Sequence, residues 1–475
     1  MSLGTSPSFQ ILFATFFGAV IVNAPARANI GQEFGFGSRS ASLGGASVAY
    51  GFGAFAAYSN PAGVVESDNA GFRIELGLLS MMPHFTPISG VLVENDYVAD
   101  QETTKDVDTD YRSTLGQLIG VNLRLVPQWG NLSVGVTAFM PLQQVAYMDS
   151  GESYVPEYVL YRSRTQRPQV DLAFGMELSR KLKVGFGFQL AYALTSSATV
   201  FLQTESTKPS TMRFASSLKT KLGPQFGATY STSETPNDPL ATTFGAVLRL
   251  PVSSPNEIFL KSGARAFGGF AALDFNFIAR SSLFYDPLTL ELGSSFPTPF
   301  LTDHLARTLI QFDYQRWSAF APPALLIIDP QTEGCGAAPC GVTVSGGTIP
   351  SFPYRNIVVP RIGQEMQISG ARVRMGYSYR PSIFSSLPTG AGNYLDPPRH
   401  NLSAGLGWTL HPQALLNTPV QLDLHLAYCP LEKQTIVKAP GDETGSGTAS
   451  KKIGSPGYDA GGQLYGGGIT LGLAI

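Results

Sequence analysis

The chain of 475 residues carries 32 basic and 34 acidic side chains, and this balance excludes the strongly basic surface typical of nucleic-acid-binding proteins. Only 14% of its residues are charged, well below the roughly 25% of an ordinary soluble domain. Beyond the N-terminus no apolar run reaches the roughly 18 residues of a membrane-spanning helix, which excludes a polytopic helical membrane protein.

The first residues predict an export signal. Residues 11–22 form a continuous apolar run that is too short to span a membrane as a helix, and the small-x-small pattern Ala26-Arg27-Ala28 follows it. Residues 1–10 contain no Lys or Arg, so the usual positive start of a signal peptide is missing. We expect a signal peptide over residues 1–28; the alternative is a first buried strand.

Residues 29–71 are rich in Gly and Ala, almost free of charge, and do not alternate as a strand does. The pair Gly44-Gly45 permits close approach of backbones, and Asn60-Pro61 sets a rigid turn. Ala62 and Gly63 continue this small-residue run. We therefore expect a compact segment that packs inside a larger structure.

From residue 72 onward the chain alternates with a period of two. In residues 402–410 the apolar and the small or polar residues fall on opposite faces. The same pattern recurs in strands of about ten residues, as a membrane-spanning β-barrel requires. The fold class is therefore predicted to be all-β: a transmembrane antiparallel up-and-down barrel over residues 72–475, with an even number of strands near 14.

The candidate strands follow one another along the chain with few interruptions. They lie at 72–80, 113–126, 131–141, 168–178, 182–202, 211–222, 224–231, 240–251, 257–264, 270–280, 305–317, 356–368, 370–380, 399–410, 419–428 and 465–475. Short turns at 127–130 and 179–181 are typical of the periplasmic end of such barrels. Long connections are expected outside the cell, at 81–112, 142–167, 281–304, 318–355 and 429–464.

The sequence shows little that indicates catalysis, a metal or a cofactor. His400 and Ser403 are three apart, so on a strand they face opposite sides, which argues against a nucleophile and base pair. Cys335 and Cys340 lie in a Gly- and Ala-rich stretch without a nearby His, a pattern that favours a small disulfide over zinc. We expect no enzyme activity.

Arg372 and Arg374 alternate with apolar residues and are predicted to face the lumen. Two interpretations stay open. The guanidinium groups would bind the carboxylate of a ligand through paired N–H donors. Alternatively they pair with lumen acids such as Asp274 and Asp313 and stiffen the barrel.

Residues 37–63 resemble the N-terminal hatch of the FadL family of outer-membrane transporters for long-chain fatty acids and aromatic hydrocarbons. The similarity consists of an Arg, the run Gly44-Gly45-Ala46, and then Asn60-Pro61-Ala62-Gly63 at the family's spacing. Three weaker similarities follow in family order, at 315–320, 372–381 and 387–403.

The resemblance implies a barrel plugged by a hatch (29–71), acting in the outer membrane of a Gram-negative cell as a monomer surrounded by lipid and lipopolysaccharide. It implies passive uptake of a hydrophobic ligand, with lateral exit at the third strand near Phe139 and Pro141. Phe34 and Phe36 are candidate pocket residues. Aromatic residues of the 142–167 loop are candidates for first capture: Tyr147, Tyr154, Tyr158 and Tyr161.

One alternative function uses the same hatch motif. PorV-type relatives resemble the same pattern and act as docking partners for secreted or surface proteins. A continuous apolar path through the lumen favours transport, whereas a sealed barrel with ordered outer loops favours docking. The sequence identifies neither the ligand nor the driving force.

Overall fold

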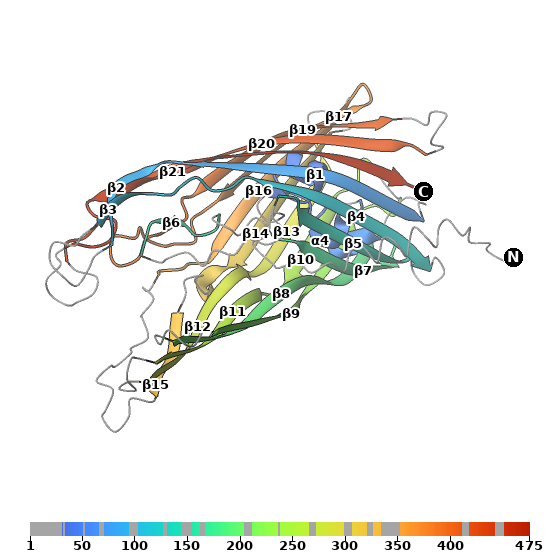
Figure 1. Cartoon of the computed structure of the whole chain (residues 1–475). Coiled ribbons are helices and arrows are strands. Elements are labelled where there is room, and N and C mark those ends of the chain that lie inside the picture. The colour runs from blue at the N-terminus through green and yellow to red at the C-terminus, as the bar shows by residue number, and fades with distance from the viewer. Residues whose placement is uncertain are drawn as a thin grey trace.

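The computed structural model (Figure 1) describes the barrel, the segment inside it and part of the outer loops. The described residues are 31, 34–50, 53–65, 71–94, 103–126, 131–143, 154–161, 167–203, 211–235, 238–265, 272–298, 306–320, 326–333, 352–410, 418–441 and 451–475. The expected signal peptide, Tyr147 and the Cys335–Cys340 pair lie outside these ranges.

A closed antiparallel barrel of 14 strands forms the body of the protein, which confirms the predicted fold class and strand number. The ring closes because β1 pairs with β4 on one side and with β21 on the other. The strands are β1 (Phe72–Phe85), β4 (Thr114–Val126), β5 (Leu132–Pro141), β7 (Gln169–Ser179), β8 (Leu182–Gln203), β9 (Thr211–Ser231), β10 (Thr243–Arg249), β13 (Leu288–Pro297), β14 (Ala306–Arg316), β16 (Ile357–Ile368), β17 (Ala371–Arg380), β19 (Arg399–Leu410), β20 (Val420–Val437) and β21 (Gly457–Ala474).

The alternation of side chains separates a lipid face from a lumen face. On β20, Leu424 and Leu426 are exposed on the outside, and Asp423 and His425, which alternate with them, are buried in the lumen. An apolar exterior around a polar interior is the pattern of an outer-membrane barrel. The protein is therefore an outer-membrane barrel.

No helix in the described ranges is both long and apolar enough to cross a membrane.

Three strand predictions were wrong in detail. The expected strands 211–222 and 224–231 are a single long strand, β9. The stretch 281–304, expected to be an external connection, contains the end of strand β12 and the whole of barrel strand β13. The strands expected at 257–264 and 270–280 exist, but they lie outside the barrel.

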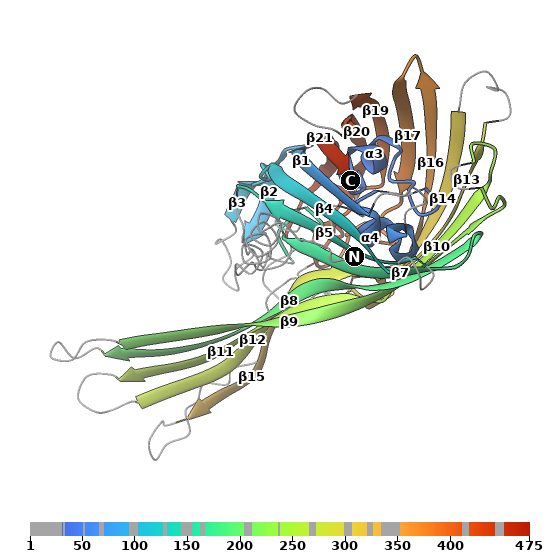
Figure 2. The ribbon, with the colours of Figure 1, turned by 90° about the vertical axis from the view of Figure 1, so that its right-hand side faces the viewer.

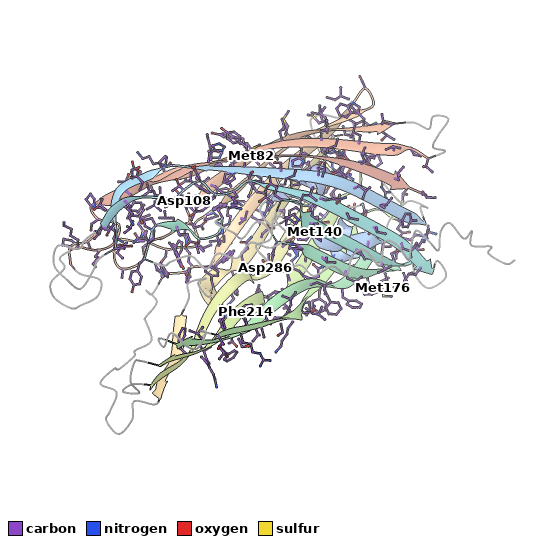
Figure 3. The ribbon with its side chains drawn as sticks, viewed as in Figure 1. Met82, Asp108, Met140, Met176, Phe214 and Asp286 are labelled. Atoms are coloured by element: carbon purple, nitrogen blue, oxygen red, sulfur yellow. The ribbon has the colours of Figure 1, made fainter. Side chains whose placement is uncertain are left out.

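Those two strands belong to an arm that projects from the barrel (Figure 2). The arm consists of β11 (Val252–Arg265), β12 (Ala272–Asp286), β15 (Leu326–Glu333) and the outer halves of β8 and β9. The strand order is β9-β8-β11-β12-β15, and the β8–β11 pairing is parallel. Buried Asp286 lies at its base (Figure 3) and accepts hydrogen bonds from Arg167 and Gln189.

Short elements complete the fold. Outside the barrel they are the pair β2 (Ile88–Glu94) and β3 (Thr103–Val107), the pair β6 (Glu157–Tyr158) and β18 (Tyr394–Leu395), and the 3-10 turn η3 (Trp317–Ala319). The N-terminal segment contains α3 (Gly37–Ser42), α4 (Ala56–Ser59) and the 3-10 turn η1 (Pro61–Val64). It lies within the ring of strands (Figure 2).

Candidate functional site

The N-terminal segment 34–65, called the hatch below, fits against the barrel wall because the wall there is bare backbone. At Gly227 a Cβ atom would lie 2.1 Å from Asn60 Oδ1, and at Gly185 it would lie 2.3 Å from the carbonyl carbon of Pro61. The glycines that meet the hatch in this way are Gly120, Gly135, Gly175, Gly185, Gly227, Gly245, Gly293, Gly363, Gly376 and Gly405. This glycine girdle seats the hatch in close contact with the wall.

Asn60 joins the hatch to itself and to the wall. Its Nδ2 atom donates to the Val48 carbonyl at 2.8 Å and to the Ala228 carbonyl at 3.2 Å. Its Oδ1 atom accepts from the Ala62 amide at 3.0 Å and so caps η1, where Pro61 takes the first position. The Asn-Pro-Ala-Gly run is thus a turn that attaches this part of the hatch to the Val48 segment and to the barrel wall.

Gly44 and Gly45 perform the equivalent role at the opposite wall. Both have positive φ angles, 67° and 79°, which glycine adopts without strain. The Gly44 amide donates to Ser403 Oγ at 3.0 Å, and Arg361 Nη1 donates to the Gly44 carbonyl at 2.8 Å. All six predicted hatch-motif residues therefore lie in the lumen. The barrel residues that hold Gly44, Ser403 and Arg361, lie outside the motif and were not predicted to contact it.

Buried ion pairs hold the lumen wall around the hatch. Arg374 donates to Glu365 at 2.6 Å and also to Asp423, and its side chain has no exposed surface. Arg361 pairs with Asp313 at 2.6 Å, whereas Asp274 lies on an arm strand. Of the two interpretations, pairing with lumen acids thus describes Arg374. Its partners are Glu365 and Asp423 instead of the expected Asp274 and Asp313.

Arg372 lies in a different environment from Arg374. It lines a cavity of about 720 Å³ on the side of the hatch that faces the short turns, the periplasmic end. Many charged side chains line this cavity: Arg39, Arg73, Glu75, Lys183, Arg307, Glu365, Arg372 and Asp423. Its walls suit water and ions better than a hydrocarbon.

The opposite side of the hatch is apolar. Phe36 packs on Tyr58, with ring centroids 4.6 Å apart, and Phe34 belongs to the same buried cluster. Barrel residues of this cluster are Leu79, Met81, Leu118, Phe139, Ile357, Val359, Ala427, Cys429, Leu431, Ile436, Tyr458, Ala460 and Leu464. We call this cluster of packed side chains, between hatch and outer loops, the apolar chamber; the name refers to the side chains and not to an open cavity.

The outer loops roof the chamber. Tyr158 stacks on Phe85 with ring centroids 4.0 Å apart, and Tyr161 lies 5.2 Å from the same ring. The Tyr158 hydroxyl donates to the Gly461 carbonyl and accepts from its amide; burial raises the pKa of Tyr158 to about 12, so it stays protonated. Expected as capture residues, Tyr158 and Tyr161 are in fact buried.

One edge of the chamber wall is poorly closed. The ladder between β5 and β7 ends at the pair Phe139–Gln169, although β5 continues to pair with β4 as far as Pro141. Pro141 is the last residue of β5 and Pro168 directly precedes β7, and a proline has no N–H to donate. Buried Phe139 lies beside this end of the ladder.

Comparisons with known proteins agree with this architecture. No family model matches the chain. A toluene transporter of Pseudomonas putida, TodX, superposes with a TM-score of 0.53 at 14% identity, covering 93% of this chain and 99% of its own. A FadL homologue of Pseudomonas aeruginosa superposes with a TM-score of 0.56 at 10% identity, covering 92% and 98%. The chain has the FadL-type fold.

A curated relative covers a shorter stretch. Alkane uptake protein A of Marinobacter nauticus is 33% identical over 134 residues, 28% of this chain and 27% of that protein. The chain thus matches about a quarter of the length of this relative. At these identities the FadL-type structures show the fold alone, so the predicted roles of single residues remain proposals.

Proposed function

We propose that this FadL-type barrel is a member of the FadL family and carries hydrophobic compounds passively across the outer membrane. The observation that supports this most directly is the apolar chamber between the roofing loops and the hatch. Apolar side chains lining a lumen, where barrels are ordinarily polar, suit a ligand that avoids water.

Phe34 and Phe36 form the floor of the chamber in this proposal. Both rings are buried, and Phe36 is held between Phe55 and Tyr58, with centroid distances of 6.0 and 4.6 Å. A hydrocarbon that enters the chamber replaces these ring contacts with its own. Phe34 and Phe36 therefore occupy the position that the ligand takes when it binds.

The exit proposed is lateral, through the wall beside Phe139. A path straight down crosses the glycine girdle, which the hatch fills, and then the charged cavity that contains Arg372. Moving an apolar ligand into that cavity costs about 25 cal/mol of free energy for every Å² of its apolar surface that becomes exposed to water. The end of the β5–β7 ladder leads instead toward the lipid.

The ligand class follows from the apolar side chains of the chamber. We propose long-chain fatty acids, aromatic hydrocarbons or alkanes as ligands, with no cofactor and no catalytic step. A barrel closed by its own strands needs no second subunit, so we propose that it acts as a monomer within outer-membrane lipid and lipopolysaccharide.

Uptake in Gram-negative cells that lack their own fatty-acid porin tests this function. Labelled oleate, toluene and hexadecane are supplied separately, with and without the protein. Restored uptake of any one supports transport and gives its ligand class. Correctly inserted protein that restores none of them contradicts the proposal and favours the docking function of PorV-type barrels.

A further inference from the structure

The arm is longer than a membrane barrel requires. At about 3.3 Å per residue, the 21 residues of β9 extend over roughly 70 Å, whereas the apolar band of an outer-membrane barrel is about 25 Å tall. Only Gln225–Ser231 of β9 pair with β10 in the closed wall. The outer part, beginning at Thr211, has left the barrel (Figure 2).

One face of this outer part is nonetheless apolar. Met212, Phe214 and Leu218 alternate along β9 and are 70%, 59% and 37% exposed. The row continues across the arm, because Phe214 lies opposite Ala198, Ala198 opposite Leu260, and Leu260 opposite Phe277. An apolar surface of this kind, left in water, marks an interaction site.

The opposite face of the arm carries the charges. Arg213, Lys219 and Lys221 alternate with the apolar residues of β9, and Glu257 and Lys261 occupy the same face of β11. Two apolar residues, Phe259 and Ile278, also lie on this face. The arm is therefore an amphipathic sheet, with its β9 apolar row free of charge.

The apolar face is continuous with the surface that lipid already covers. Leu222, Phe226 and Tyr230 lie on the same face of β9 as Phe214, at barrel level, and all three are exposed. A wall that bends outward at its outer rim turns its lipid-facing side toward the membrane. The face that contacts acyl chains in the barrel thus continues along β9 into the arm, where Phe214 lies (Figure 3).

We propose that the arm rests on the outer leaflet, with the face that contains Met212, Phe214 and Leu218 inserted among the lipids. The charged face is then directed to water, as in amphipathic helices that lie in a membrane interface. This contact fixes the rotation and depth of the barrel in the membrane. It acts close to the wall edge where the β7–β8 pairing ends, at Val170 and Leu190. It depends on the apolar face alone and holds whatever the barrel transports.

Fluorescence quenching at neighbouring positions tests the proposal. The full chain, with Cys335, Cys340 and Cys429 replaced by Ser, receives a single cysteine for an environment-sensitive dye. Phe214→Cys and Leu218→Cys report the apolar face, Arg213→Cys is the matched control on the charged face, and Phe226→Cys is the reference for lipid contact. Each variant is placed, one copy per disc, in phospholipid nanodiscs with or without brominated acyl chains.

We expect brominated lipid to remove at least half of the dye emission at positions 214, 218 and 226, and aqueous iodide to quench only position 213. If iodide quenches position 214 as strongly as position 213, the arm stands in water and the proposal is wrong. If position 214 resists iodide but ignores brominated lipid, protein covers this face. Discs that hold two copies are measured in parallel. If position 214 resists iodide only there, the occupant is a second chain, and either result overturns the lipid assignment.

Discussion

The ring of Phe139 lies so close over Gly116 that a Cβ atom on Gly116 would be 2.1 Å from Phe139 Cε2. Any other residue on β4 at this position would push the ring away. The contact occurs beside the end of the β5–β7 ladder, where Gly116 lies opposite Pro141. Phe139 therefore covers the β4 side of the wall, next to the place where β5–β7 pairing ends.

Phe139→Ala is expected to raise the initial rate of hydrocarbon uptake several-fold, because it removes the ring that lies beside the proposed exit. The cost in stability is about 3–5 kcal/mol, typical of a buried Phe→Ala change. Uptake of labelled hexadecane and toluene measures the effect. Met81→Ala, in the same chamber but on β1, is the control; an equal rise in both variants would assign the effect to general loosening.

The double variant Pro141→Val and Pro168→Val is expected to slow uptake strongly. Both valines supply the N–H groups that the prolines lack, so the β5–β7 ladder can extend past Phe139 and close the wall. Pro360→Val, at a proline inside β16, adds an N–H far from the proposed exit and should leave uptake unchanged. Wild-type uptake in the double variant would exclude this exit.

Asn60→Ala is expected to loosen the hatch. It removes donors to the Val48 and Ala228 carbonyls, and unsatisfied buried groups of this kind cost about 1–3 kcal/mol. Sensitivity of cells to large hydrophilic antibiotics reports the leak. Asn401→Ala, a lumen change at a side chain that accepts from the barrel residue Cys429, should not produce it. Equal sensitivity of the two variants would mean that Asn60 does not anchor the hatch.

Arg374→Met and Arg372→Met separate a scaffold residue from a cavity residue. The first leaves the buried Asp423 carboxylate without its cation and Glu365 with Arg39 alone, which should lower the free energy of unfolding by about 3–5 kcal/mol. The second changes a partly exposed side chain, with an expected effect below about 1 kcal/mol. Urea unfolding in detergent measures both, and similar losses would contradict the distinction.

Much of the barrel could be predicted, since a strand between lipid and lumen must alternate. β13 was missed because its apolar residues, such as Leu290 and Leu292, end in Gly-Ser-Ser and then Pro297, a composition that resembles a loop. The arm strands were misassigned for the opposite reason. The arm strands alternate apolar and polar residues as membrane-spanning strands do. Alternation alone does not tell whether a strand belongs to the barrel wall or to a sheet outside it.

The site was harder to predict than the barrel. The hatch motif identified Gly44 and Asn60, but the wall that receives them is made of glycines far apart in the sequence. In the sequence Gly227 reads as one more small lumen residue; only the register between β9 and β8 brings it opposite Gly185. The burial of Tyr158 and Tyr161 likewise depends on loops folding inward, which no local pattern indicates.

The glycine girdle also makes this protein a scaffold for a nanopore. With residues 34–65 deleted, the lumen at the girdle would be bounded by the peptide groups of these glycines and by the ion pairs Arg374–Asp423 and Arg361–Asp313 beside them. Single residues could then be placed at Gly185, Gly227 or Gly376 to set the charge and width of the lumen there.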